Sequence, residues 1–409
     1  MFPRRIGIDA RAAFADHPRG AGRNLLDALR AVARLRPDLQ IELYRRRTAP
    51  PEPARALLAA FRNLRDRPIE MPGDRFDAWF QLRLPWAARL DGVDLLHLPL
   101  NAAPAWRSVP YVVTIHDLIP LHVRDEAGPR DRERFRRGVL RAVRSAAHIL
   151  TVSEQTRAAL RREFDVPFDR MSVVPWAPDA LIAAPTDPES ARRGVDRVRE
   201  RYGLERPWLL NFSGASPRKN AAGVLRGLAH TPEALRRQYT LVMVGCEPQE
   251  FRQSLGRLAS ALGVASASRV LGFVPHDDLP ALVRGAKGVL LPSLEEGFGL
   301  PILDAFACRV PVLTSDRGAM REVAGDAAVF CDPRDAHSIA AGLARLVEDG
   351  ATLALRRRAA ERVRSFTWER TARGLLAAYE RATQTALAPA PAADAREAAL
   401  GQGATRLDG

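Results

Sequence analysis

The chain has 409 residues, of which 46% are hydrophobic and 27% charged, and its formal net charge is +14. This length exceeds one ordinary core and predicts two domains, whereas the composition excludes a fibrous or largely disordered protein. The three cysteines, Cys246, Cys308 and Cys331, lack metal-ligand spacing, so neither a disulfide framework nor a zinc site is expected.

Short aliphatic runs alternate with longer helical patterns through the first half of the chain. The predicted strands are residues 5–10, 41–45, 93–98, 111–116, 148–153 and 171–176. Helices in the gaps would form crossover connections, which predicts a doubly wound parallel sheet. A charge precedes any apolar region of signal-peptide length, and no apolar run reaches transmembrane length, so we expect a cytoplasmic protein that does not span a membrane.

A glycine pair, Gly20 and Gly22, lies between the first predicted strand and the helix that follows it. The pair lacks the third glycine of a dinucleotide fingerprint, which argues against NAD or FAD. Its amides could face a phosphate group across a cleft, and an ordinary tight turn explains the pattern equally well.

The strand predicted over residues 111–116 ends in adjacent His116 and Asp117. Ligands of open parallel sheets bind beyond the carboxyl ends of the strands, so this imidazole lies at the ligand edge. His116 could contact a ligand hydroxyl, and a packing histidine with satisfied hydrogen bonds is the commoner alternative.

Residues 130–147 are rich in arginine and carry Phe135, Val139, Leu140 and Val143 at helical spacing. The pattern fits a helix lying on an anionic membrane, or an ordinary amphipathic crossover helix packed on its sheet, which is the commoner structure. We therefore expect at most peripheral contact with an anionic membrane, at its inner face.

A proline-containing linker, residues 181–206, separates the two halves and includes a charged helical piece at 189–202. The predicted domains are residues 1–180 and 207–366, followed by a helix over 367–387 that crosses back and a disordered tail over 388–409. The second domain repeats the rhythm of the first, with strands at 208–213, 240–245, 269–274, 288–293, 310–315 and 327–331.

Two adjacent cations, Arg218 and Lys219, follow the strand at 208–213 and precede a helix. Positive charge at a helix N-terminus is unfavourable unless an anion lies there. Lys219 is one of only two lysines in an arginine-rich chain, which favours a specific phosphate contact over a solvated cationic turn.

A glycine-rich turn, residues 296–301, follows the strand at 288–293 and opens a helix. Its glycines let the backbone approach a ligand, and the free amides of the helix start predict an anion site. Glu296 and Asp304, eight residues apart, could accept hydrogen bonds from ligand hydroxyls. Taken alone, the turn also fits an ordinary strand-to-helix connection with solvated acidic residues.

Together these strand ends resemble glycosyltransferase family 4, the retaining group with the GT-B fold, from about residue 6 to residue 379. Residues 292–308 look like the Glu-x7-Glu signature of the family, with Asp304 in place of the second glutamate. Residues 114–118, 151–154 and 217–220 are similar to other family motifs in the family's order. The resemblance implies an α/β protein with two Rossmann-like, doubly wound domains facing across a cleft.

The resemblance also implies a nucleotide diphosphate sugar as donor and a glycan or lipid-linked glycan as acceptor. It assigns Arg218 and Lys219 to the donor diphosphate, Glu296 to the donor sugar, and His116 to the sugar or acceptor as the catalytic set. The further residues that it implies are Gly20, Gly22, Ser213, Gly214, Phe298, Gly299, Leu300 and Asp304 for the donor, and Asp117 and Ser153 for the acceptor side.

The chain has no Asp-x-Asp triplet, so we expect neither a metal nor another cofactor, and the two cations would stabilise the leaving phosphate. No carboxylate nucleophile is identifiable, which favours front-face attack with retention of configuration. Residues 7–11 look most like mannosyl- and related transferases of surface polysaccharide assembly. The alternatives are a catalytically weak nucleotide-sugar-binding or scaffolding subunit and a GT-B-like sugar-nucleotide epimerase. A nucleic-acid binder, suggested by charge alone, lacks a recognised binding module.

Overall fold

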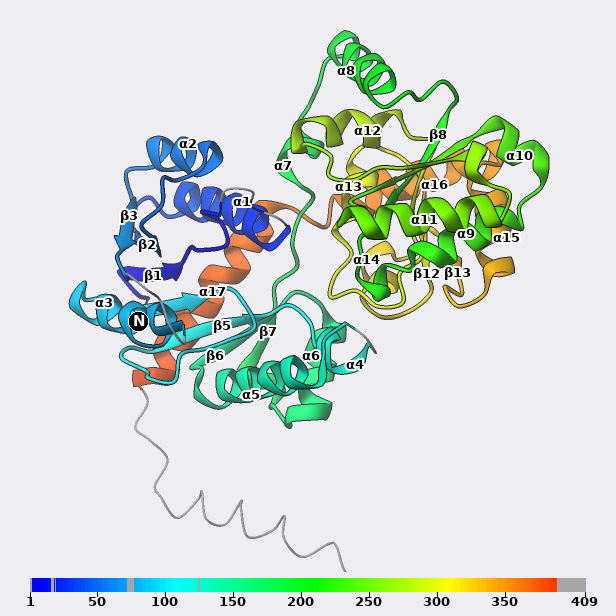
Figure 1. The fold of residues 1–409 in the computed structure, drawn as a ribbon. Coiled ribbons are helices and arrows are strands. Elements are labelled where there is room, and N and C mark those ends of the chain that lie inside the picture. The colour runs from blue at the N-terminus through cyan, green and yellow to red at the C-terminus, as the bar shows by residue number, and fades with distance from the viewer. Residues whose placement is uncertain (1, 16–17, 19, 72–76, 124–125, 388–409) are drawn as a thin grey trace, which may run out of the picture.

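The computed structural model of the chain describes residues 2–15, 18, 20–71, 77–123 and 126–387. The tail predicted over 388–409 lies outside these residues. Figure 1 shows two α/β domains, the N-terminal one on the left and the C-terminal one on the right. Both domains are built on a parallel sheet, so the predicted architecture of two doubly wound domains is confirmed.

The N-terminal sheet has the strand order β3-β2-β1-β4-β5-β6-β7. All residues of β4 and β5 are buried, because helices cover both faces of the sheet. The strands are β1 (Arg5–Asp9), β2 (Gln40–Arg46), β3 (Leu64–Ile69), β4 (Leu95–Leu98), β5 (Tyr111–Ile115), β6 (His148–Thr151) and β7 (Met171–Val173). The helices are α1 (Gly20–Leu35), α2 (Glu52–Ala60), η2 (Trp79–Arg83), α3 (Leu84–Leu90), α4 (Ile119–His122), α5 (Pro129–Ser145) and α6 (Glu154–Phe164).

The C-terminal sheet has the strand order β10-β9-β8-β11-β12-β13. Its strands are β8 (Trp208–Phe212), β9 (Thr240–Val244), β10 (Ser268–Val270), β11 (Gly288–Leu291), β12 (Val312–Ser315) and β13 (Val329–Cys331). The helical elements are η4 (Pro217–Lys219), α9 (Ala221–Ala229), α10 (Glu233–Gln238), α11 (Gln249–Ala261), α12 (Leu279–Gly285), α13 (Leu300–Ala307), α14 (Gly318–Ala324), α15 (Ala336–Leu346) and α16 (Asp349–Val363).

Every predicted strand is observed, most of them shorter at one end, but the sequence missed β3 at the sheet edge. Cross-strand ion pairs hold this strand: Arg45 Nε lies 2.7 Å from Asp66 Oδ1, and Arg67 Nε lies 2.7 Å from Oε2 of the buried Glu42. Its three charged residues and Pro68 obscure the alternation by which a strand is recognised, and such residues are typical of a protected sheet edge.

The chain passes between the domains twice. The first crossing runs from β7 through α7 (Ala180–Ala183) and α8 (Pro188–Arg201), which is the helix predicted over 189–202. The second leads from α16 into α17 (Trp368–Leu387), which packs against α1 and β4 to β7. Trp368 Nε1 donates to Pro178 O at 2.9 Å and Thr371 Oγ1 to Pro175 O at 2.7 Å, so the two crossings are bonded side by side.

Candidate active site

A cleft of about 480 Å³ opens between the two domains, where the residues that follow β5, β8 and β11 meet. It brings together residues that are up to 284 positions apart in the sequence, from Gly20 to Asp304. The predicted site residues that line it are Gly20, His116, Asp117, Arg218, Lys219, Glu296, Phe298, Gly299, Leu300 and Asp304.

The cationic turn η4 is fixed by the residue that follows it. Asn220 adopts the left-handed conformation, with φ of 55°, which asparagine tolerates better than most residues. Its side-chain amide donates to Pro292 O at 3.0 Å and to Pro333 O at 2.7 Å. These bonds join the turn to the strand ends beside it and direct Arg218 and Lys219 into the cleft.

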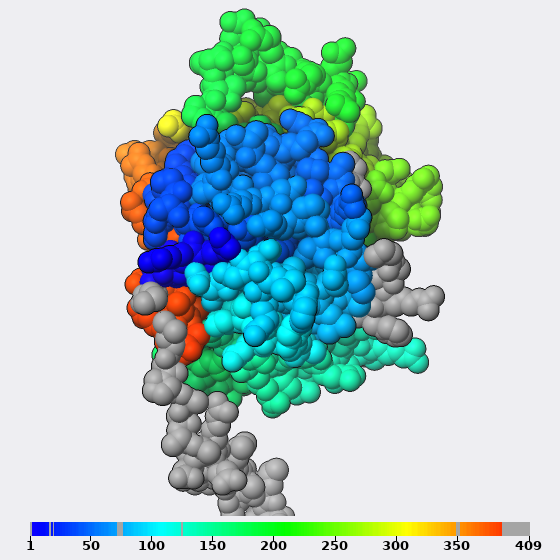
Figure 2. Space-filling view, turned by 90° about the vertical axis from the view of Figure 1, so that its left-hand side faces the viewer, coloured from blue at the N-terminus to red at the C-terminus, as the bar shows by residue number. Residues whose placement is uncertain are grey.

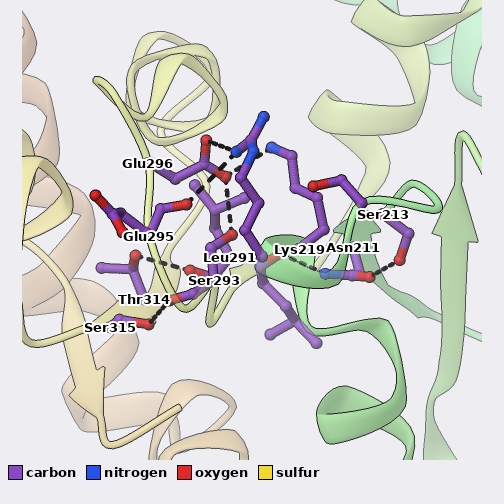
Figure 3. A network of polar contacts seen from close by, with 12 residues as sticks. Asn211, Ser213, Lys219, Leu291, Ser293, Glu295, Glu296, Thr314 and Ser315 are labelled. Carbon is purple, nitrogen blue, oxygen red and sulfur yellow. Dashed lines mark hydrogen bonds and ion pairs between the residues drawn. The ribbon is translucent and has the colours of Figure 1, made fainter. Parts of the chain in front are cut away.

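Glu296 lies between the two cations, as Figure 3 shows for Lys219. Its Oε1 accepts hydrogen bonds from Lys219 Nζ at 2.7 Å and Ser293 Oγ at 2.8 Å, and its Oε2 accepts one from Arg218. Burial alone would raise the pKa of Glu296, but the neighbouring charges of Lys219 and Arg218 outweigh it and lower that pKa. The carboxylate is therefore ionised and leaves the three-residue cluster with one net positive charge.

The strand ends below this cluster are held by hydroxyl groups. Ser315 Oγ donates to Ser293 O at 2.6 Å, and Thr314 Oγ1 donates to Leu291 O at 3.0 Å (Figure 3). These bonds connect the ends of β11 and β12, so the loop that carries Glu296 begins from a rigid base.

Gly297 marks a close approach of the two domains. A Cβ atom at this position would lie 2.7 Å from His116 O, so only glycine fits without movement of the backbone. The buried Ser153 donates to Gly297 O at 2.8 Å and accepts from Thr156 N at 3.1 Å, which caps α6. Ser153 is outside the described cleft lining and instead joins the domains.

His116 lines the cleft as a neutral imidazole. Burial lowers its pKa, despite the opposing influence of the Pro99 carbonyl and Asp117. Its Nε2 lies 2.7 Å from Pro99 O, which requires the proton on Nε2 and leaves a lone pair on Nδ1. The ring also stacks on Trp176 with centroids 6.0 Å apart. The residue can accept a hydrogen bond from a ligand hydroxyl.

Asp304 lies on α13 at the opposite wall, and its Oδ1 accepts from Asp179 N at 2.9 Å. Burial, together with the charges of Asp179 and Asp27, raises the pKa of Asp304 to about 8, against the opposing effects of that hydrogen bond and Arg23. At neutral pH Asp304 is thus a largely protonated carboxylic acid, bonded to the first crossing.

Arg23, Asn24, Trp176 and Asp179 also line the cleft, and none of them was predicted as a site residue. Arg23 and Asn24 directly follow the glycine pair at the start of α1, so the same pattern that suggested Gly20 and Gly22 could have suggested these two residues. The other two lie in the crossing after β7, whose course the sequence pattern does not specify.

Gly22, Ser213 and Gly214 are not among the residues that line the cleft; Gly22 is buried, and Ser213 and Gly214 are half-buried. A Cβ atom on Gly22 would lie 2.1 Å from Ala12 O, so this glycine permits close packing of α1. Ser213 donates to Asn211 Oδ1, and Gly214 lies beside it at the end of β8. Ser213 and Gly214 therefore precede the cationic turn without lining the cleft.

The described residues contain no group of three or more His, Cys, Asp or Glu side chains arranged to hold a metal ion. In the same part of the chain, no helix combines the length and the apolar character needed to cross a bilayer.

Two family models match the chain: one described as Glycosyltransferase Family 4 over residues 18–180, and one described as Glycosyl transferases group 1 over residues 192–366. The chain is 32% identical over 304 residues to O-antigen chain mannosyltransferase B of Escherichia coli, covering 73% of this chain and 77% of that protein. It is 28% identical over 293 residues to a serotype-specific mannosyltransferase WbdA of Escherichia coli, covering 70% of this chain but only 35% of that protein.

Solved structures share the fold. HepE of Anabaena, in complex with UDP and glucose, superposes with a TM-score of 0.68 at 19% identity, covering 91% of this chain and 98% of that one.

Proposed function

The chain belongs to glycosyltransferase family 4, and on that premise we propose that it transfers a hexose from a nucleotide diphosphate sugar to a hydroxyl of a glycan or lipid-linked glycan acceptor. The transfer would retain the configuration of the anomeric carbon and require no metal ion. A lipid-linked acceptor would place the enzyme at the inner face of an anionic membrane.

The cluster of Arg218, Lys219 and Glu296 carries the proposal. As the bond between the anomeric carbon and the diphosphate breaks, negative charge grows on the leaving phosphate, and a pair of fixed cations stabilises it. Arg218 and Lys219 are held in place before any ligand enters, because both pair with one ionised carboxylate. This arrangement supports a reaction in which side chains do the work that a metal ion does elsewhere.

The carboxyl groups beside the cations support retention by front-face attack. A double displacement needs a free carboxylate to attack the anomeric carbon. Glu296 is occupied by two cations and Ser293, and Asp117 accepts from Ile119 N at 3.1 Å. Glu126 pairs with Arg218 and accepts from Ser216 Oγ. An NMR assignment of the anomeric configuration of the product tests retention, which front-face attack and double displacement share, and an inverted product would contradict both.

Mannose is the favoured sugar because of the similarity to two mannosyltransferases of Escherichia coli. The UDP bound to HepE concerns that protein, so uridine and guanosine donors are both to be tested. A panel of GDP-, UDP- and ADP-sugars, scored by thermal shift and then by turnover, identifies the donor. Binding without turnover, with any acceptor, would indicate a nucleotide-sugar-binding subunit instead.

Lys219→Ala and Glu296→Gln test the site directly. Each variant should lower kcat by about 100-fold or more, as the loss of a preorganised charge contact does in other enzymes, with the fold intact by circular dichroism. Lys287→Ala is the matched control, because Lys287 is the other lysine of the chain and is exposed outside the cleft lining. Wild-type turnover in both site variants would overturn the assignment.

A further inference from the structure

The helical segment of η2 and α3 exposes an apolar stripe. Leu82, Trp86 and Leu90 are spaced four residues apart and are 56%, 50% and 69% exposed, whereas Trp79 and Leu84 face the core. A surface helix normally directs such residues inward, so an outward stripe indicates a surface that binds something apolar.

A second segment extends the stripe. Trp106 and Leu100, in the loop after β4, are 37% and 38% exposed, and the rings of Trp106 and Trp86 lie with centroids 6.0 Å apart. The five side chains thus come from two separate segments. Tryptophan combines an apolar ring with a polar N–H, which suits the boundary between hydrocarbon and water.

Positive charge surrounds these side chains. Residues 79–90 and 99–110 contain Arg83, Arg89 and Arg107, all exposed, and no acidic residue. The helix α5 has seven arginines and two acidic residues, and buries its apolar residues Val139 and Val143 in the domain core. The surface is therefore apolar at its centre and strongly basic at its edges.

A large cavity of about 1240 Å³ adjoins the stripe. Gln81, which is next to Leu82, and Leu100 of the second segment both line this cavity. The α5 arginines Arg130, Arg134, Arg137 and Arg141 line it, and they outnumber the three acidic residues of the lining, Asp77, Asp131 and Glu133. This cavity is large enough for a phosphate-bearing headgroup, and its arginines can bind phosphate oxygens.

We propose that this surface, the α3 face, docks on an anionic lipid bilayer. Leu82, Trp86 and Leu90 would lie at the acyl boundary, while the arginines of α3 and α5 contact headgroup phosphates. In Figure 1, α3 lies at the edge of the N-terminal domain away from the C-terminal domain, and Figure 2 looks onto that side, where the cyan segment around residue 100 forms part of the surface. Docking there leaves the cleft between the domains open to ligands.

The proposal rests on the membrane setting of the proposed function. Vesicle binding tests it without donor or acceptor, so this result can fail independently of the glycosyl transfer. The full chain should sediment with vesicles of phosphatidylglycerol and phosphatidylcholine, and less so as NaCl is raised. The double variant Leu82→Ser, Leu90→Ser should bind at least about tenfold more weakly, because it removes two inserting side chains. Leu353→Ser is the matched control, since Leu353 of α16 is 65% exposed and lies in the other domain.

A charge arm completes the test. Arg83→Gln with Arg89→Gln should weaken binding to the anionic vesicles by about tenfold, whereas the exposed α16 pair Arg356→Gln with Arg357→Gln should not. Equal binding to pure phosphatidylcholine vesicles would overturn the electrostatic part of the proposal. Absence of vesicle binding, or a dimer in analytical ultracentrifugation that the Leu82, Leu90 variant dissociates, would overturn the bilayer as the occupant.

Discussion

Glu296 determines how Arg218 and Lys219 are presented to a ligand. Two cations at adjacent positions repel each other, and one ionised carboxylate between them removes that repulsion. Because its pKa is lowered, Glu296 stays charged at neutral pH and holds the two cations side by side, where both can contact a diphosphate. A glutamine at this position keeps the shape but leaves Lys219 without its carboxylate and Arg218 with only the longer 3.5 Å pair to Glu126, which is why a large loss of turnover is expected.

Asp304 makes the stability of the protein depend on pH. Its folded pKa of about 8 is above the value of about 4 in an unfolded chain, so the folded state binds more protons between these values. Unfolding free energy should therefore fall as pH rises from 5 to 8, by up to about 1.4 kcal/mol per pH unit. Asp304→Asn cannot ionise and still accepts from Asp179 N, so its stability should fall less over this range.

Urea unfolding of both proteins at pH 5, 6.5 and 8 measures the difference in slope. Asp316→Asn is the control, because Asp316 is exposed. If wild type and Asp304→Asn lose stability with pH in parallel, Asp304 does not titrate as described.

At the scale of elements, the site is built from strand-to-helix turns that need particular small residues. The loop between β11 and α13 contains two glycines with different tasks. Gly299 has φ of 107°, a conformation that other residues rarely adopt, and starts α13. Gly297 instead allows the backbone after β5 to approach, so it determines how closely the two domains meet.

Gly297→Ala should hold the domains apart. The added methyl would lie 2.7 Å from His116 O, and relieving that contact moves the cations away from His116. We expect kcat to fall by about tenfold or more, since misplacement by about 1 Å is costly in a preorganised site. Steady-state kinetics measures this, with Gly256→Ala in α11 as the control, because nothing lies within 4 Å of a Cβ there. Unchanged kinetics for Gly297→Ala would show that the close approach is not needed.

Most of the sheets could be predicted from the sequence, because fully buried parallel strands are continuous apolar runs that differ clearly from the helices between them. β3 could not, since cross-strand ion pairs replace apolar residues there. The strand-end rule identified Arg218, Lys219 and Glu296 as neighbours in the cleft. It could not assign Ser153, whose hydroxyl is used between the domains, or the contact of Asp304 with Asp179, which depends on the path of the crossing.

At the scale of the whole molecule, the two domains are joined across the cleft by polar contacts. Glu322 of α14 accepts from the amides of Glu154 and Gln155 at 2.9 and 3.2 Å, which caps α6 from the other domain. His122 of α4 lies 3.1 Å from Glu295 and 2.7 Å from Glu163. The structure is therefore a closed arrangement of the two domains.

His122 should make this closure depend on pH. Its hydrogen bond with Glu295, aided by Glu163, raises its pKa to about 9 despite burial, above the ordinary value of about 6.5. Glu163 lies in the same domain as His122, so only the part of the pKa rise that comes from Glu295 is lost when the domains separate. The charge that stabilises closure is present at pH 6.5 and is lost as pH rises through 9. Small-angle X-ray scattering should show the radius of gyration increasing between these pH values in the wild type. In His122→Gln, which cannot titrate, it should stay constant, and a matching increase would exclude His122 as the cause.

The side-by-side arrangement of the two crossings restricts how the protein can move. Two adjacent links between rigid bodies leave one easy rotation, about the line along which they lie, because sliding or twisting would break the bonds of Trp368 and Thr371 to the first crossing. A rotation about that line would separate the contacts of Gly297, Glu322 and His122 together, so a ligand that bridges the domains at one of these points would stabilise the others.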